Sequence, residues 1–235
     1  MLLAPVHPID LDTINGFTDE HHCLPAVGGC EGVGVVEKIG CGAIDLNNGD
    51  WVVSKGFNWG TWQTMAVADA ADVMRVPKDI PLLGAATLAG NACTAYRLLK
   101  DFVDLKPRDV IIQNGANGAV GQAVMQLARE WGIITVNVVR DRPKIKALSE
   151  YLQGRGATHV ITDTFLKSSS MQFFMKSLPG TPKLALNCVG GKLNVEMMKY
   201  MPFESVLVTY GEVSHEPVVM PANVISNKRV GEKLR

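Results

Sequence analysis

The second half of the chain alternates short apolar runs with segments of helical periodicity. The apolar runs are Asp109–Gly115, Thr135–Val139, His159–Thr162, Leu184–Val189 and Ser205–Tyr210. Each run has the length of a buried strand, and the segments between them have room for a helix. Five strands joined by helices predict an α/β fold, a doubly wound open parallel sheet with right-handed crossovers.

Two of the connecting segments carry a clear helical face. The first face recurs at i, i+3, i+4, i+7 and i+8, and consists of Val120, Ala123, Val124, Leu127 and Ala128. Gly132 follows it, at a position where glycine commonly ends a helix. The second face consists of Ile145, Leu148 and Leu152. Pro143 fits the first turn of that helix, with Asp141 or Arg142 before it.

Residues 1 to about 80 have a strand-and-turn character instead. Three segments are apolar or alternate polar with apolar residues, and they are Glu31–Gly40, Asn47–Val53 and Gly60–Ala68. None of them has a helical period, so they predict a small β-rich domain. We therefore expect two domains, residues 1–80 and residues 81–235.

The composition bounds the number of domains and excludes some functions. The chain has 235 residues, of which 47% are hydrophobic, enough for one large domain or two modest ones that each bury a core. The 23 basic residues balance 23 acidic ones, which argues against a broad nucleic-acid or polybasic membrane surface. No apolar run is long enough to cross a bilayer, so we expect no membrane span.

The cysteines and the N-terminus bear on the compartment. Five cysteines, an odd number without a C-x-x-C spacing, fit a reducing environment. The first basic residue is Lys38. A signal peptide needs a basic start and an organellar presequence is rich in arginine, so the sequence indicates no targeting peptide in this chain.

A glycine-rich turn follows the first strand of the second half. Gly115, Gly118 and Gly121 form G-x-x-G-x-x-G between that strand and its helix. Glycine allows a tight turn and a close approach of a pyrophosphate to the backbone, and the last glycine lets helix and strand pack closely. The free N–H groups at the helix start attract anions. The pattern predicts dinucleotide binding, with a plain strand-to-helix turn as the alternative.

The end of the next strand indicates which dinucleotide. Arg140 and Arg142 stand where an acidic residue would hold the ribose of NAD, and arginine there accommodates the 2′-phosphate of NADP. We therefore predict NADPH as the cofactor. Alternatively, Asp141 caps the following helix, both arginines are solvated, and NAD is accepted.

Several segments together resemble a known enzyme family. They read LPAVGGCEGVG (24–34), GDWVV (49–53), GTWQT (60–64), AATLAGNACTAYRLL (85–99), VIIQNGANGAVGQAV (110–124), ITVNVVRDRP (134–143), LALNCVGGK (184–192) and VTYG (208–211). The chain resembles the mitochondrial 2-enoyl thioester reductases, NADPH-dependent enoyl-[acyl-carrier-protein] reductases within the zinc-independent medium-chain dehydrogenase/reductase superfamily. The resemblance runs from about residue 3 to about residue 219.

The resemblance implies an architecture and an activity. Residues 1–80 would be part of a GroES-like catalytic domain, and residues 81–235 a Rossmann NADPH-binding domain, with family members extending beyond both ends of this sequence. The family reduces trans-2-enoyl thioesters of acyl carrier protein or coenzyme A in mitochondrial fatty acid synthesis, and it forms homodimers. A mitochondrial location is therefore expected by resemblance. With no further strand beside it, Ser205–Tyr210 would be an exposed apolar edge of the sheet.

The resemblance also assigns cofactor contacts. They map to Asn91, Asn117, Gly118, Ala119, Val120, Arg140, Asp141, Arg142, Tyr210, Gly211, Glu212 and Val213. Three residues depart from the family. Gly118-Ala119 stands where the family commonly has Ser-Gly, and Glu212 stands where it commonly has Gly. A carboxylate at Glu212 would repel a nearby phosphate.

The catalytic tyrosine of the family has no counterpart here. Its position falls on Thr18, whose hydroxyl can donate one hydrogen bond but has a shorter reach. Thr18 is the candidate catalytic residue, with an ordinary loop residue as the alternative. We expect impaired reduction of enoyl thioesters by this chain.

A zinc site is not expected. Gly29-Cys30-Glu31 stands where the zinc-dependent relatives have Gly-His-Glu, and His21-His22-Cys23 is more consistent with a turn. Two other functions stay open. One is NADPH:quinone reduction within the same superfamily, and the other is a non-catalytic nucleotide-binding isoform.

Overall fold

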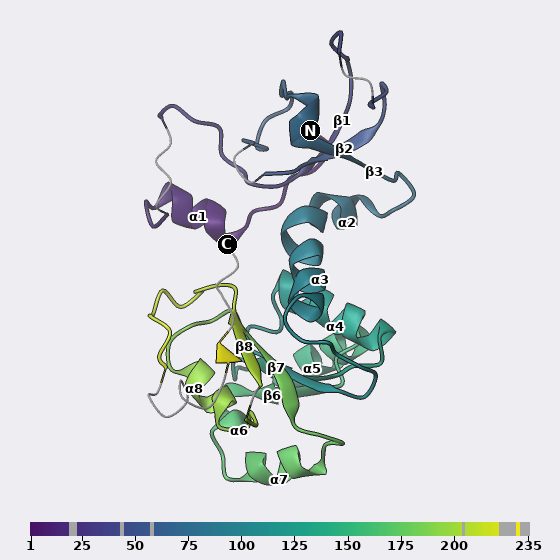
Figure 1. Cartoon of the computed structure of the whole chain (residues 1–235). Helices are drawn as coiled ribbons and strands as arrows, with labels where there is room; N and C mark the ends of the chain where they lie inside the picture. The colour runs from purple at the N-terminus through teal and green to yellow at the C-terminus, as the bar shows by residue number, and fades with distance from the viewer. Residues whose placement is uncertain (19–22, 43–44, 57–58, 204, 221–228, 231–235) are drawn as a thin grey trace. The chain divides into compact units, whose positions relative to one another are not determined.

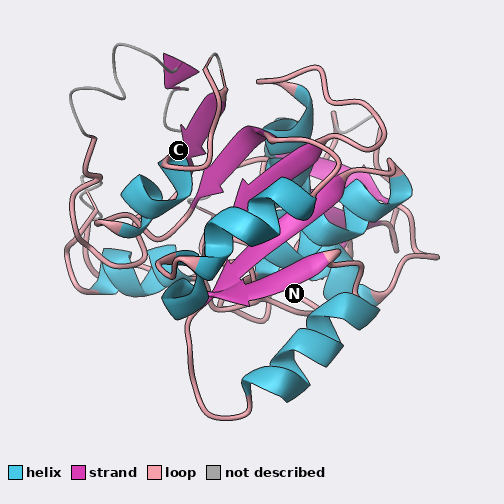
Figure 2. Cartoon of the chain, turned by 90° about the horizontal axis from the view of Figure 1, so that it is seen from below, coloured by secondary structure: helices cyan, strands magenta, loops and turns pink. Residues whose placement is uncertain are grey.

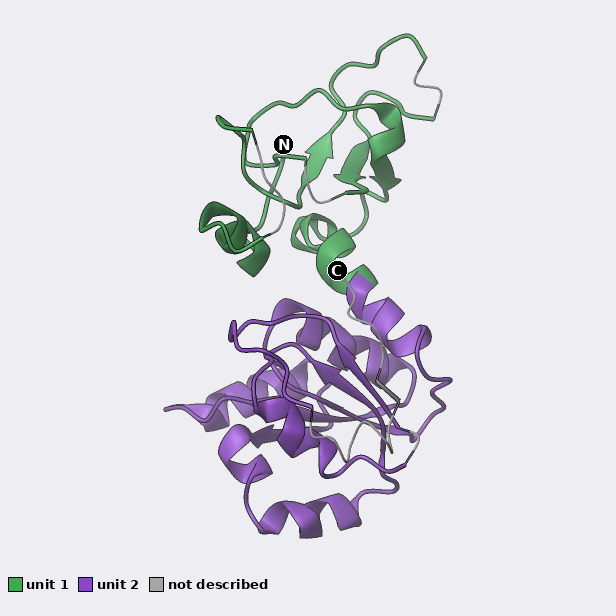
Figure 3. Ribbon diagram, turned by 60° about the vertical axis from the view of Figure 1, so that its left-hand side comes forward, with its two compact units in different colours: residues 1–93 green, residues 94–235 purple. Residues whose placement is uncertain are grey.

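The computed structural model describes residues 1–18, 23–42, 45–56, 59–203, 205–220 and 229–230. The contacts divide the chain into two compact units, Met1–Cys93 and Thr94–Arg235 (Figure 3). The sequence-based boundary at residue 80 falls before the helix at Leu82–Ala86. Ala85 and Ala86 of that helix pack into the core of the first unit, which explains why that unit reaches Cys93.

A parallel sheet forms the centre of the second unit (Figure 1). Its strands are β4 (Val110–Gln113), β5 (Ile134–Val139), β6 (His159–Thr162), β7 (Pro182–Asn187), β8 (Val206–Thr209) and β9 (Arg229–Val230). Their order is β6-β5-β4-β7-β8-β9, and every neighbouring pair is parallel. The predicted α/β fold is thereby confirmed. The expected bare edge at Ser205–Tyr210 is wrong, because β9 pairs with Val206 and Leu207.

Helices cover both faces of this sheet (Figure 2). They are α3 (Cys93–Lys100), α4 (Ala119–Glu130), α5 (Ile145–Gly154), α6 (Asp163–Leu166), α7 (Ser170–Ser177) and α8 (Leu193–Met198). On one face, α3 and α4 pack on Ile111, Leu184 and Val208. On the other face, α6, α7 and α8 pack on Ile112 and Val138. This alternation along β4 is the period of a strand buried on both sides.

The sequence predicts the end of α4 correctly, but not the start of α5. At the end of α4, Gly132 has φ +68°, and its N–H and that of Ile133 donate to the carbonyls of Arg129 and Ala128. This is a Schellman motif, so the predicted glycine stop is confirmed. The predicted start of α5 at Pro143 is wrong. The helix begins at Ile145, after Lys144 in a left-handed conformation with φ +65°.

The first unit holds a small antiparallel sheet. Its strands β1 (Val33–Val35), β2 (Trp51–Ser54) and β3 (Val73–Val76) are ordered β1-β2-β3. The helical segments are α1 (Pro8–Ile14), η1 (Ala70–Asp72), α2 (Leu82–Ala86) and η2 (Leu88–Ala92), the last of which is a π-helix. The core is small and consists of Val33, Val53, Val76, Ala85 and Ala86.

The strand expected at Gly60–Ala68 is wrong. The amides of Thr61 and Trp62 donate to Gly29 and Gly28, and the rest of the segment is irregular. The Val67 side chain is fully exposed, so the alternation of apolar and polar residues in this segment does not mark a buried face. The third strand is Val73–Val76 instead.

Among the described residues, no helix combines the length and apolar character needed to cross a membrane.

Candidate functional site

The strand order of the second unit places a switch point between β4 and β7. From β4 the chain moves outward through β5 and β6, then returns to β7 and moves the other way through β8. The loops at the carboxyl ends of β4 and β7 therefore diverge. In open α/β sheets, this is where ligands bind.

The glycine-rich turn lies at that switch point. Gly115 has φ +60°, and a Cβ added to it would lie 3.2 Å from the Cβ of Cys188 in the loop after β7. Gly118 is the extended N-cap of α4. A Cβ added at Gly121 would lie 2.5 Å from the Ala116 carbonyl oxygen, so only glycine fits there. The Gln122 backbone amide donates to the Gly118 carbonyl, the first bond of the helix. The amides that precede it at the helix start have no acceptor within the helix.

Buried amide side chains fix the loops at the switch point. Asn114 Nδ2 donates to Asn187 Oδ1 at 2.6 Å, and Asn114 Oδ1 accepts from the backbone amides of Cys188 and Val189 at 2.7 and 3.2 Å. Asn187 Nδ2 donates in turn to Thr209 Oγ1 at 3.1 Å. The ends of β4, β7 and β8 are thus held by one chain of neutral hydrogen bonds.

A second amide pair links the glycine turn to β5. Gln113 Nε2 donates to Asn137 Oδ1 at 2.7 Å and to the Gly121 carbonyl at 3.0 Å. Sequence reasoning missed the amides in both groups. The available signal was a polar residue closing an otherwise apolar strand, as in Gln113-Asn114 and Asn187.

Tyr210 and Gly211 lie at the same edge, after β8. A Cβ added at Gly211 would lie 3.3 Å from Cys188 Sγ, so the thiol sits between Gly115 and Gly211. The Tyr210 hydroxyl is buried beside this thiol and interacts with it. Burial raises the pKa of Tyr210 well above its usual value, and the neighbouring Cys188 raises it further. Burial also raises the pKa of Cys188.

The loop after β8 is tied to the loop after β7. Val213 and Ser214 donate their amides to the carbonyls of Cys188 and Val189 at 3.1 and 2.9 Å. The side chains of Glu212 and Val213 are exposed. The structure thus brings the glycine turn and the predicted residues of the β8 loop to one edge of the sheet.

The predicted phosphate-binding residues Arg140, Asp141 and Arg142 follow β5 at this same edge. All three side chains are exposed, and neither arginine forms an ion pair among the described residues. The Asp141 amide donates to Asp163 Oδ1 at 2.8 Å. The alternative role of Asp141 as a helix cap is wrong, because the N-cap of α5 is Lys144.

Asn91 lies in the first unit, within the π-helix η2. It is buried, and its Nδ2 has no hydrogen-bond partner among the described residues. The adjacent Gly90 amide donates to Glu31 Oε1 at 2.7 Å, and Glu31 Oε2 lies 2.7 Å from His7 Nε2. The hydrogen bond with Glu31 raises the pKa of His7. No local sequence pattern predicts this link from Glu31 to the segment that carries Asn91, because Glu31 and Gly90 are 59 residues apart.

Cys30 occupies the place of a zinc ligand in zinc-dependent relatives. Its amide donates to the buried Asp10 carboxylate at 2.8 Å. Burial and this carboxylate raise the pKa of the thiol to about 12, so Cys30 is protonated at neutral pH. The described residues contain no group of three metal-ligating side chains suited to an ion. His21 and His22 lie outside the described residues.

Thr18 is the last described residue before a gap at residues 19–22. Its Oγ1 is buried and lacks a hydrogen-bond partner among the described residues. The neighbouring Phe17 ring is exposed.

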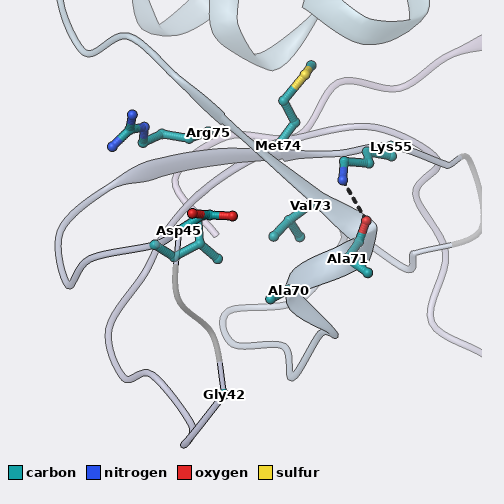
Figure 4. A pocket seen from close by; sticks show the side chains of 9 residues that line it. Gly42, Asp45, Lys55, Ala70, Ala71, Val73, Met74 and Arg75 are labelled. Atoms are coloured by element: carbon teal, nitrogen blue, oxygen red, sulfur yellow. Dashed lines mark hydrogen bonds between the residues drawn. The ribbon is translucent and has the colours of Figure 1, made fainter.

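A pocket of about 520 Å³ also lies in the first unit, between Asp45, Lys55, Val73 and Arg75 (Figure 4). None of the predicted site residues lines it. Lys55 Nζ donates to the Ala71 carbonyl at 2.7 Å, and that bond holds it against the pocket wall. The pocket is therefore separate from the residues considered above.

Known proteins resemble this chain in sequence and structure. Residues 1–78 match the family described as alcohol dehydrogenase GroES-like domain. The mitochondrial enoyl-[acyl-carrier-protein] reductase of Xenopus tropicalis is 48% identical over 230 residues, covering 98% of this chain and 65% of that protein. The solved mitochondrial 2-enoyl thioester reductase Etr1p/Etr2p heterodimer from Candida tropicalis is 30% identical, with a TM-score of 0.89. The similar region covers 97% of this chain and 71% of the solved chain.

This chain belongs to the mitochondrial 2-enoyl thioester reductase family. The structure of an Etr1p complex with NADP and crotonyl-CoA is also similar, at 31% identity and a TM-score of 0.89 over 97% of this chain and 71% of that one. The chain spans less than two thirds of the length of the curated reductases that it matches, for example 65% of the Xenopus protein. The expected family is confirmed.

Proposed function

We propose that this chain binds NADPH and acts as a reductase of trans-2-enoyl thioesters in mitochondrial fatty acid synthesis. The substrate would be an enoyl group on acyl carrier protein or coenzyme A. Support comes from the family, from curated relatives named mitochondrial enoyl-[acyl-carrier-protein] reductase, and from the related Etr1p structure with NADP and crotonyl-CoA. The assembly proposed is a homodimer, as the family implies.

The switch point fits a dinucleotide. The three glycines carry no side chain at their positions in the β4–α4 turn and in the first turn of α4, and a Cβ at Gly118 would stand 3.2 Å from the Gly115 carbonyl oxygen. Ala119 and Val120 begin α4 beside this turn, so their amides suit a pyrophosphate.

One observation carries the choice of NADPH over NADH. Arg140 and Arg142 are both exposed at the carboxyl end of β5, next to the glycine turn, and neither is held by an acidic partner among the described residues. A guanidinium pair in this position suits the 2′-phosphate, which NADH lacks.

The reaction places hydride on C3 and a proton on C2 of the enoyl thioester. When bound, NADPH supplies the hydride. Negative charge then develops on the thioester oxygen, and a donor aimed at that oxygen stabilises the transition state. The Thr18 hydroxyl is our candidate donor, because it stands at the position of the family tyrosine and has no hydrogen-bond partner among the described residues. The short reach of threonine makes impaired turnover the expected result.

Nucleotide titrations test the cofactor. We expect the unmodified chain to bind NADPH more tightly than NADH, by about tenfold for each 1.4 kcal/mol that the arginines contribute. The double variant Arg140→Ala/Arg142→Ala should bring the two affinities together. The control Arg97→Ala/Arg129→Ala removes two exposed arginines from α3 and from the far end of α4, and it should keep the preference. Equal affinities in the unmodified chain would contradict the assignment.

Turnover measurements test the reaction and the role of Thr18. We expect NADPH oxidation with an enoyl-CoA to be about 10²–10³-fold slower than for a family member that has the catalytic tyrosine, the usual cost of losing such a donor. Thr18→Val should lower the rate further, while the control Thr13→Val, whose hydroxyl donates to the Ile9 carbonyl within α1, should not. NADPH binding without turnover would support the non-catalytic alternative, and turnover with quinones alone would support a quinone reductase.

A further inference from the structure

Asp163 joins the segment that carries the two arginines to the neighbouring strand. In the parallel pairing of β5 and β6, Val139 lies opposite Thr162, so the chain leaves both strands at the same level. Asp163 is the first residue after β6. Its Oδ1 accepts the Asp141 amide at 2.8 Å and the Thr164 amide at 3.0 Å.

This contact fixes the backbone between the two arginines. Asp141 lies between Arg140 and Arg142 in the chain, and the bond from its amide ties this segment to Asp163. Two residues later, Lys144 turns the chain sharply with φ +65°. A backbone held in one conformation lowers the entropy lost when the arginine side chains order around a phosphate.

The charge of Asp163 acts in the opposite direction. A carboxylate near a bound phosphate repels it, as proposed for Glu212. The hydrogen bond to the Asp141 amide, called the tether below, predicts that removing Asp163 weakens NADPH binding. The charge predicts that removing Asp163 strengthens it. The sign of the change in NADPH affinity decides between them.

We propose that Asp163 is a positioning residue that holds Arg140 and Arg142 in place and so sets the preference for a dinucleotide with a 2′-phosphate. This role rests on the proposed NADPH binding. Asp163 acts through the backbone of Asp141, and it needs no contact with the dinucleotide.

Two substitutions separate the tether from the charge. Asp163→Ala removes both the acceptor oxygen and the charge, whereas Asp163→Asn removes the charge and keeps an acceptor oxygen. We expect Asp163→Ala to weaken NADPH binding by about five- to tenfold and to change NADH binding by less than about twofold. Asp163→Asn should retain the NADPH preference of the unmodified chain.

Asp109→Ala is the matched control. Asp109 also accepts a loop amide, from Lys106 at 2.8 Å, but it lies before β4, at the opposite edge of the sheet. We expect it to leave the ratio of NADPH to NADH affinities unchanged. Thermal unfolding followed by circular dichroism identifies any variant whose loss of binding comes from unfolding.

The outcomes distinguish this role from the proposed function. An unmodified chain that prefers NADPH, with the same ratio in Asp163→Ala, overturns the role of Asp163 alone. Tighter NADPH binding by Asp163→Ala and by Asp163→Asn also overturns it, because the charge would then dominate. An unmodified chain without a preference contradicts the proposed cofactor, and with it this role.

Discussion

The two units bury polar side chains of different kinds. In the first unit, the buried polar centre is charged, since Asp10 and Glu31 are 5% and 2% exposed and face His7 and the Cys30 amide. In the second unit, the corresponding groups are neutral amides. Gln113, Asn114, Asn137, Asn187 and Asn194 are all buried.

The difference follows from the segments that each set of buried polar side chains connects. The first unit has a small apolar core, and its charged cluster ties α1, the segment before β1 and η2 together across long stretches of chain. The second unit has extensive cores on both faces of its sheet, and amides such as Asn114 and Asn187 fix the loops at one edge of it. Charged groups respond to pH, whereas amides do not. The comparison therefore predicts that the units differ in what destabilises them.

The largest expected effect is on the first unit. Glu31→Ala removes the buried carboxylate that pairs with His7 and accepts from the Gly90 amide. Removing one partner of a buried pair costs about 3–5 kcal/mol. Hydrogen exchange measured by mass spectrometry should show this loss in peptides from residues 1–93, with peptides from the second unit much less affected.

Arg75→Ala is the control for that variant. Arg75 and Asp50 form an exposed ion pair at 3.8 Å, which contributes at most about 1 kcal/mol. A loss of that small size for Glu31→Ala would mean that the charged cluster contributes little to the first unit.

A smaller effect is expected from the amides. Asn187→Ala removes the acceptor of Asn114 Nδ2 and of the Gly190 amide. Leaving a buried donor unpaired costs about 1–3 kcal/mol. The free energy of unfolding of the second unit should fall by that amount equally at pH 6 and pH 8, because no titrating group is removed. A loss that varies with pH would show that the amides are coupled to an ionisable group.

The smallest expected effect is on the pH dependence of stability, which has opposite directions in the two units. The pKa of His7 is raised by its hydrogen bond to Glu31, so its stabilisation is present below the ordinary histidine pKa and is lost as the pH rises through the raised pKa. The pKa of His159 is lowered by burial beside Phe174, so the second unit is destabilised as the pH falls below the ordinary histidine pKa. Each pKa unit of difference corresponds to about 1.4 kcal/mol.

Single substitutions assign these two dependences. His7→Gln should reduce the loss of stability of the first unit between pH 6 and 8. His159→Phe should reduce the loss of stability of the second unit at acidic pH. Hydrogen exchange corrected for its intrinsic pH dependence measures both. The same direction of change in both units would show that the histidines do not control it.

The sequence by itself determined the order of strands and helices in the second unit and the place of its glycine turn. Apolar runs buried on both sides, an apolar helical face and the Gly132 stop are local patterns, and each was read correctly. Val73–Val76 was missed, because such a short strand has no alternation of its own. Only the tertiary structure decided which polar groups meet. Glu31 and Gly90 are 59 residues apart, Asn114 and Asn187 are 73 apart, and Asp141 and Asp163 are 22 apart. No local pattern encodes such pairs, because sheet order and helix packing bring them together.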